Sequence, residues 1–314
     1  MQDRIRGKDL QKHKLFTLVL PAILTTALWG SAVPCIKVGY ALFGIGSDSF
    51  SQLVFAGWRF TMAGILTLMI ALLIGKRNIS INRSNIGAIL SICLFQSIIQ
   101  YVCYYIGLSH TTGTKGALLS GTQTFFAILF AHIFLANDKL TLTKTIGCLM
   151  GFSGVVLLQL GGDLGGFSLM GDGLVLLSAA SAGMGALVSR VMTAGRDPMV
   201  LTGWQLTLGG IFLLALGYGG GGSIGTLSIK GCFLMLYLII LSSAAFTIWT
   251  TLLKKWPVGT VSLYGFLIPV FGAILSAVFL SERSWTFQSW CALGLVSAGI
   301  IAANYTRKSK DAIT

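Results

Sequence analysis

Long apolar stretches, each close to the length of a membrane-spanning helix, alternate with short polar segments along the whole chain. A helix needs about 20 apolar residues to cross a hydrocarbon core of roughly 30 Å, whereas the strands of a membrane β-barrel would alternate apolar and polar residues. The pattern therefore predicts an all-α integral membrane protein with ten transmembrane helices. The expected spans are 15–39, 51–74, 86–108, 114–135, 144–160, 172–190, 199–218, 230–253, 258–280 and 287–305.

Composition supports a membrane location. The chain is 54% hydrophobic and only 10% charged, while a soluble domain carries about 25% charged residues. Its net charge of +13 comes mainly from Lys and Arg in the segment 1–14, in the tail and in alternate loops such as 75–85 and 136–144. Such a bias follows the positive-inside rule. It predicts a multi-pass protein of the cytoplasmic (plasma) membrane with both termini cytoplasmic, and it does not indicate a nucleic-acid partner.

The chain contains two copies of one five-helix unit. GWRFTMAGI at 57–65 is matched by GWQLTLGGI at 203–211, and FLANDKLT at 134–141 by FLSERSWT at 279–286. Because five is an odd number, the second copy must enter the membrane in the opposite orientation. Inverted repeats are typical of transporters that hold a substrate near the membrane midplane. The expected organisation is a cytoplasmic segment, 1–14, the repeats 15–160 and 172–305, and a cytoplasmic tail, 306–314.

Three stretches resemble the drug/metabolite transporter superfamily in its ten-helix EamA branch. They are WGSAVPCIKVGY at 29–40, GWRF at 57–60 and LIPVFGAILSAVFLSERSW at 267–285, whose most specific part runs from Pro269 to Glu282. The first copy departs from that pattern, with Gln123 near the proline position and Asn137 in place of the glutamate. The resemblance implies a carrier of small metabolites, often directed outward, in a family that includes amino-acid exporters and quaternary-ammonium carriers.

Acidic side chains are not expected at mid-membrane depth. All nine Asp and Glu residues lie in tails, in loops or at span ends, whereas proton-coupled carriers commonly use a carboxylate within the membrane. His132 is the remaining candidate proton carrier, and we expect it instead to be neutral and hydrogen-bonded to the backbone.

Two cations within the spans need partners. Arg59 lies well inside the second span, where a charge is costly, and its counterpart in the second copy is the neutral Gln205. It could pair with helix carbonyls, with Asp48 or with a ligand carboxylate, and all three alternatives stay open. Lys37 lies near the outer end of the first span. Its stem could reach water, or it could line an outer vestibule where Pro34 lets the helix bend.

Polar and aromatic residues at mid-depth are the candidates for substrate contact. Aromatic side chains suit an apolar or aromatic substrate, and they could also hold a quaternary ammonium by cation–π attraction. The candidate substrate-binding residues are Trp29, Gln96, Gln100, Tyr101, Tyr104, Gln123, Met184, Trp249 and Tyr264.

These features predict a secondary transporter that moves a small metabolite by alternating access, foremost an exporter of amino acids or related compounds. The alternative within transport is uptake or exchange of choline-like quaternary ammonium compounds. The alternative of another class is a membrane-embedded enzyme or scaffold. We expect no cofactor, no metal and no catalytic residue, because no P-loop, metal-ligand cluster or nucleophile motif is present. Small residues four apart, such as Gly147 and Gly151, allow close helix contact, either within the bundle or in a homodimer.

Overall fold

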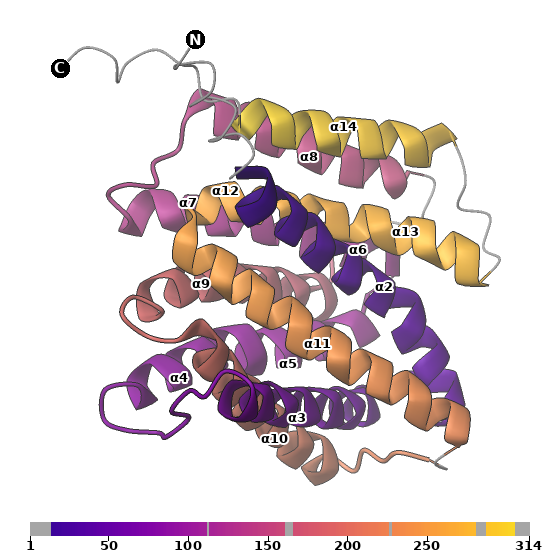
Figure 1. The fold of residues 1–314 in the computed structure, drawn as a ribbon. Coiled ribbons are helices and arrows are strands. Elements are labelled where there is room, and N and C mark those ends of the chain that lie inside the picture. The colour runs from indigo at the N-terminus through magenta and orange to yellow at the C-terminus, as the bar shows by residue number, and fades with distance from the viewer. Residues whose placement is uncertain (1–13, 112, 161–165, 226–227, 281–286, 305–314) are drawn as a thin grey trace.

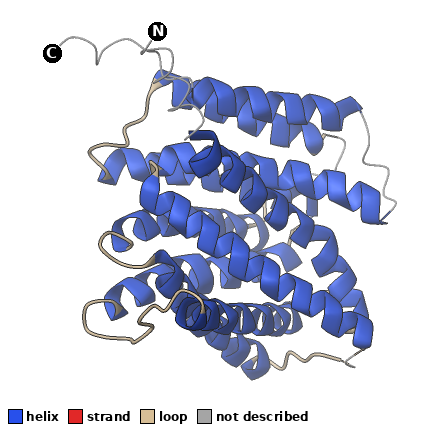
Figure 2. Ribbon diagram, viewed as in Figure 1, coloured by secondary structure: helices blue, strands red, loops and turns tan. Residues whose placement is uncertain are grey.

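The computed structural model describes residues 14–111, 113–160, 166–225, 228–280 and 287–304. The tail, most of the N-terminal segment and Glu282 lie outside the described residues. All regular structure in the described part of the chain is helical, and the helices lie side by side in one bundle (Figures 1 and 2). Eight helical segments are long and apolar enough to cross a membrane, and two shorter apolar helices, Leu142–Leu157 and Trp290–Ala303, complete the predicted ten.

The first five spans are built from nine helical elements. They are η1 (Leu15–Val19), α2 (Leu20–Leu42), α3 (Ser49–Leu73), α4 (Ile86–Cys93), η2 (Leu94–Ile99), α5 (Gln100–Ser109), α6 (Gly113–Gly121), α7 (Gln123–Phe134) and α8 (Leu142–Leu158). The helix α2 continues through Pro34 to Leu42. The first span is therefore longer than the sequence pattern indicated.

The described part of the second five spans consists of eight helical elements. They comprise η3 (Leu169–Gly173), α9 (Leu174–Met192), α10 (Pro198–Gly219), α11 (Ile229–Lys255), α12 (Val258–Ser262), η4 (Leu263–Phe266), α13 (Leu267–Leu280) and α14 (Phe287–Asn304). Three spans change helical geometry near their centres. The third widens into the π-helical η2, the fourth is interrupted between α6 and α7, and the ninth narrows into the 3₁₀ helix η4. Irregular backbone at membrane depth is tolerated where it lines a cavity or is buried in protein.

The packing of α3 against α10 shows the inverted symmetry of the two repeats. A Cβ atom on Gly64 would lie 2.6 Å from the carbonyl oxygen of Gly203, and one on Gly57 would lie 3.0 Å from that of Gly210. Gly203 and Gly210 are the repeat counterparts of Gly57 and Gly64, so each contact maps onto the other when the copies are exchanged. The two helices therefore cross antiparallel on a pseudo-twofold axis, and the predicted inverted duplication is confirmed.

The remaining helix contacts follow the same exchange. The fifth helix of each copy, α8 and α14, packs against the other, with a Cβ on Gly147 only 2.5 Å from the carbonyl oxygen of Gly299. The contact of α2 with α13 is matched by that of α9 with α7, and the contact of α2 with α11 by that of α9 with α5. Gly147 thus serves contact within the bundle.

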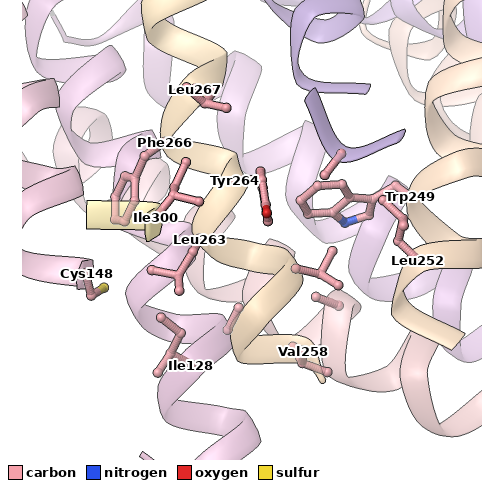
Figure 3. Packing of buried hydrophobic residues seen from close by; sticks show 14 of the residues in the cluster. Ile128, Cys148, Trp249, Leu252, Val258, Leu263, Tyr264, Phe266, Leu267 and Ile300 are labelled. Carbon is pink, nitrogen blue, oxygen red and sulfur yellow. The ribbon is translucent and has the colours of Figure 1, made fainter. Parts of the chain in front are cut away.

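The largest apolar cluster lies at the end of the bundle where α2 begins and α11 ends. Leu18, Leu253, Val258 and Leu263 are fully buried in it. Figure 3 shows Trp249 and Tyr264 among its side chains. This cluster packs residues of both repeats together at that end.

Candidate substrate-binding cavity

A cavity of about 230 Å³ lies between the two repeats, at mid-length of the helices. It is bordered by the first four spans of the first copy and by α9, α11, α12, η4 and α13 of the second. The described lining residues are Trp29, Ala32, Val33, Ile36, Arg59, Gln96, Gln100, Tyr101, Tyr104, Tyr105, Gln123, Thr124, Ala127, Ala182, Ala186, Phe246, Trp249, Ser262, Gly265 and Ile268.

Most of the residues singled out from the sequence come together here. Seven of the nine candidates line the cavity: Trp29, Gln96, Gln100, Tyr101, Tyr104, Gln123 and Trp249. Arg59 lines it as well. Two members of this group lie where the helical geometry changes. Gln96 lies within the π-helix η2, and Gln123 directly follows the interruption before α7.

Three sequence candidates lie elsewhere. Met184 is half-buried on α9, whose cavity-lining residues are instead the small Ala182 and Ala186. Tyr264 is 3% exposed and packs in the large apolar cluster, while its neighbour Gly265 lines the cavity. Lys37 is exposed and does not line the cavity.

Some lining residues carry little signal in the sequence. Ala182 and Ala186 have no chemistry that marks a site, and they line the cavity because α9 crosses it there. Phe246 and Tyr105 are aromatic, but aromatic residues are frequent in this chain and most serve packing. Their roles follow from the helix arrangement, which the pattern of one span alone does not reveal.

Aromatic rings form much of the wall. The Trp29 ring on α2 makes edge-to-face contacts with Phe246 and Trp249 on α11, at centroid distances of 5.3 and 5.2 Å. On the other side, Tyr101 is stacked at 6.2 Å from Tyr105. Such arrangements are favourable for aromatic pairs, so the wall joins the two repeats through packed rings.

A smaller cavity of about 150 Å³ adjoins the first. It shares Gln100, Tyr101, Tyr104 and Gln123 with the main cavity and adds side chains of α6 and α9, among them Ser178. The Ser178 hydroxyl donates to the backbone carbonyl of Gln100, with 2.7 Å between the oxygens. Polar groups of the third and fourth spans thus line both cavities.

Arg59 is the one cationic side chain among the described lining residues, and it is 5% exposed. Its Nε and Nη1 atoms are buried, and neither has a hydrogen-bond partner among the described residues.

Asp48, one of the partners considered for Arg59, caps a helix. Its carboxylate accepts hydrogen bonds from the backbone N–H groups of Phe50 and Ser51 at the start of α3. Hydrogen bonds from Ser51 and Phe50 hold the pKa of Asp48 below its ordinary value.

Polar contacts join the helices at the end of the bundle that holds the large apolar cluster. Asp138 is 5% exposed, accepts from the Gly259 backbone N–H at 2.9 Å and pairs with Lys144 at 2.5 Å. Arg190 donates to the carbonyl oxygens of Leu253 and Lys254.

His132 has a structural contact at the same end. Its Nδ1 atom accepts a hydrogen bond from the backbone N–H of Leu140 at 3.1 Å.

At the opposite end of the bundle, Lys115 pairs with Asp172 at 2.6 Å. Within the described part of the chain, no group of three or more His, Cys, Asp or Glu side chains could hold a metal ion.

Two inverted five-helix repeats that enclose such a cavity define a membrane carrier of the drug/metabolite transporter type. Residues 17–160 and 169–305 both match the EamA-like transporter family, and the chain belongs to that family.

Relatives of the chain are found in plants and bacteria. It is 26% identical to YvbV, an uncharacterized transporter of Bacillus subtilis, over 96% of both chains. It is 28% identical to a chloroplastic WAT1-related protein of Arabidopsis thaliana, over 87% of this chain and 64% of that protein. It is also 24% identical to YedA, an uncharacterized inner membrane transporter of Escherichia coli, over 87% of this chain and 86% of YedA. A solved crystal structure shares the fold, with a TM-score of 0.76, 19% identity and coverage of 91% of this chain and 95% of the other.

Proposed function

We propose that this protein is a secondary transporter that moves a small metabolite by alternating access through the cavity between its repeats. The observation that supports this most directly is the lining of the cavity, which both copies supply. Exchange of the two inverted copies relates one end of the bundle to the other, so a second state of opposite access can use the same two helix arrangements with the copies interchanged.

In this cycle, the end of the bundle that holds the large apolar cluster is the end that we propose to be closed. The apolar cluster, the Asp138–Lys144 pair and the Gly259 N–H contact all lie where α12 begins. In the proposed cycle these contacts separate when that end opens, and the other end then closes.

The proposed substrate is an amino acid or a related metabolite, transported outward. Contact would come from the cavity-lining candidates, with Trp29, Tyr104 and Trp249 holding the apolar part and Gln96 and Gln100 holding polar groups. Uptake or exchange of a quaternary ammonium compound is the second candidate, and the aromatic wall supports it because such rings attract cations.

The proposed location is the cytoplasmic membrane, with both termini cytoplasmic. The distribution of Lys and Arg supports this orientation. It predicts that a single cysteine at position 79 of a cysteine-free variant, in the loop after α3, reacts with an impermeant thiol reagent only after inside-out vesicles are prepared. Reaction at that position in intact cells would place this loop outside the cell and contradict the proposed orientation.

Counterflow in proteoliposomes tests the proposed function. Liposomes are loaded with an unlabelled amino acid mixture or with choline, and entry of labelled phenylalanine and then of labelled choline is followed. Trans-stimulated entry of phenylalanine supports an amino acid carrier, whereas entry of choline alone supports the second candidate. Absence of exchange across a wider set of metabolites, in liposomes that contain folded protein, would refute the carrier proposal.

A further inference from the structure

Arg59 is a buried cation that borders the cavity with part of its hydrogen-bonding capacity unused. Arg59 is 5% exposed, and its side chain lines the cavity. The Nε and Nη1 donors lack hydrogen-bond partners among the described residues. Its Cζ atom lies 4.3 Å from the ring centroid of the neighbouring Phe60. An arginine in low-dielectric surroundings is costly unless its donors are paired.

The inverted repeat provides an internal comparison. Gln205, the counterpart of Arg59, donates from Nε2 to the Ser97 hydroxyl at 2.8 Å. Ser243 stands at the repeat position of Ser97, but its hydroxyl is hydrogen-bonded to Thr67 at 2.7 Å. The Nε and Nη1 atoms of Arg59 form no hydrogen bond equivalent to the one that holds Gln205. Of the two equivalent positions, the one with the charge borders the cavity and the neutral one does not.

The charge balance of the cavity indicates what could pair with Arg59. Among the described lining residues there is no Asp or Glu, so a bound cation would meet Arg59 without a compensating carboxylate. Guanidinium groups bind carboxylates through paired, charge-assisted hydrogen bonds. Trp29, Phe246 and Trp249 provide an apolar wall for the rest of a ligand.

We infer that Arg59 is the specificity-determining residue of the cavity and that the substrate is a carboxylate with an apolar or aromatic body. This inference rests on the proposed function and narrows it. An amino acid satisfies it through its carboxylate, as does an aromatic organic acid. A quaternary ammonium compound without a carboxylate does not.

Binding of matched probes to the purified protein tests the inference. Phenylacetate and phenylacetamide have nearly the same shape and differ in charge, and benzyltrimethylammonium supplies the cation. Quenching of tryptophan fluorescence reports occupancy, because Trp29 and Trp249 line the cavity. We expect phenylacetate to bind about ten- to a hundredfold more tightly than phenylacetamide and benzyltrimethylammonium to bind more weakly than either.

Removal of the charge should remove the preference. In Arg59→Gln, which installs the residue found at the repeat counterpart, phenylacetate and phenylacetamide should bind equally. The matched control is Lys230→Gln, which removes an exposed cation of α11 outside the cavity lining; it should keep the preference. Equal binding of the two probes to the wild type, or an undiminished preference in Arg59→Gln, would overturn the inference.

Thermal unfolding gives a readout that needs no transport. Without ligand, Arg59→Gln should melt at a higher temperature than the wild type, because it removes a buried charge that lacks full pairing. Phenylacetate should raise the melting temperature of the wild type more than that of the variant, because a ligand that binds only the native state stabilises it. Destabilisation by Arg59→Gln, with equal ligand shifts, would make Arg59 a structural residue. If counterflow persists with that result, only the inference about Arg59 is refuted and the carrier proposal stands. If counterflow is absent but the melting behaviour is as expected, only the carrier proposal is refuted.

Discussion

Gly64 on α3 and Gly203 on α10 bring two backbones so close that a Cβ atom on Gly64 would lie 2.6 Å from the Gly203 carbonyl oxygen. The repeat exchanges this contact with that between Gly57 and Gly210. Small residues are needed here because close backbone approach is the main source of packing between helices in lipid. The pseudo-twofold axis of the protein therefore passes through a crossing that tolerates little side-chain volume.

Gly64→Ala should destabilise the protein by about 1–3 kcal/mol, the usual range for overpacking. Thermal unfolding in detergent measures the change. The control is Gly294→Ala on α14, where an added Cβ atom meets nothing within 4 Å. Gly294→Ala should be neutral or slightly stabilising, because alanine is the better helix former. A similar change of stability in both variants would show that the close crossing of α3 and α10 does not set the effect.

Trp29→Ala should reduce transport strongly while the protein stays folded. Trp29 contacts Phe246 and Trp249 and lines the cavity, so its removal leaves a gap where substrate would bind. Initial rates of counterflow at equal protein density measure the loss. Trp290→Ala removes an indole that is 58% exposed and lies outside the cavity lining, and it should transport normally. Equal rates in Trp29→Ala and the wild type would remove this tryptophan from the proposed site.

Asp138→Asn should destabilise the end of the bundle that holds the large apolar cluster. Asp138 pairs with Lys144, and their side chains are 4% and 14% exposed. Loss of one partner from a buried pair costs roughly 3–5 kcal/mol, and the partial exposure of Lys144 places the expected value at the lower limit. The exposed pair of Arg77 and Asp197 offers the comparison, with side chains 42% and 31% exposed. Arg77→Gln should cost less than about 1 kcal/mol. Chemical unfolding of both variants measures the two costs.

The Asp48 cap should make stability depend on pH. Because the pKa of Asp48 is lowered in the folded protein, its contribution is fully present above the ordinary carboxyl value of about 4 and is lost as the pH falls through the lowered pKa. Asp48→Asn keeps an acceptor for the helix N-terminus but removes the charge, so its difference from the wild type should shrink at acidic pH. Melting temperatures of the two proteins across this range provide the measurement. If the difference in melting temperature between the wild type and Asp48→Asn is the same at all pH values, the charge of Asp48 does not contribute to the stability of the cap.

The candidate site shows where inference from sequence reaches its limit. Trp29, Gln96 and Tyr104 were expected at mid-depth because depth follows from position along an apolar span, and they do line the cavity. Tyr264 satisfied the same criterion but is buried in the apolar cluster, since the direction of a side chain depends on the 3₁₀ turn of η4. Depth is a one-dimensional property, whereas orientation about the helix axis depends on the neighbouring helices.

The amino-acid sequence by itself determined the ten spans, the duplication and, through the odd number of spans in each copy, the inversion. These follow from hydrophobic length and from counting, which involve only local chemistry. The tertiary structure alone decided that Gln205 is held by Ser97 while Arg59 borders the cavity. That difference depends on contacts between residues far apart in the chain, and the near-identical motifs around the two positions conceal it.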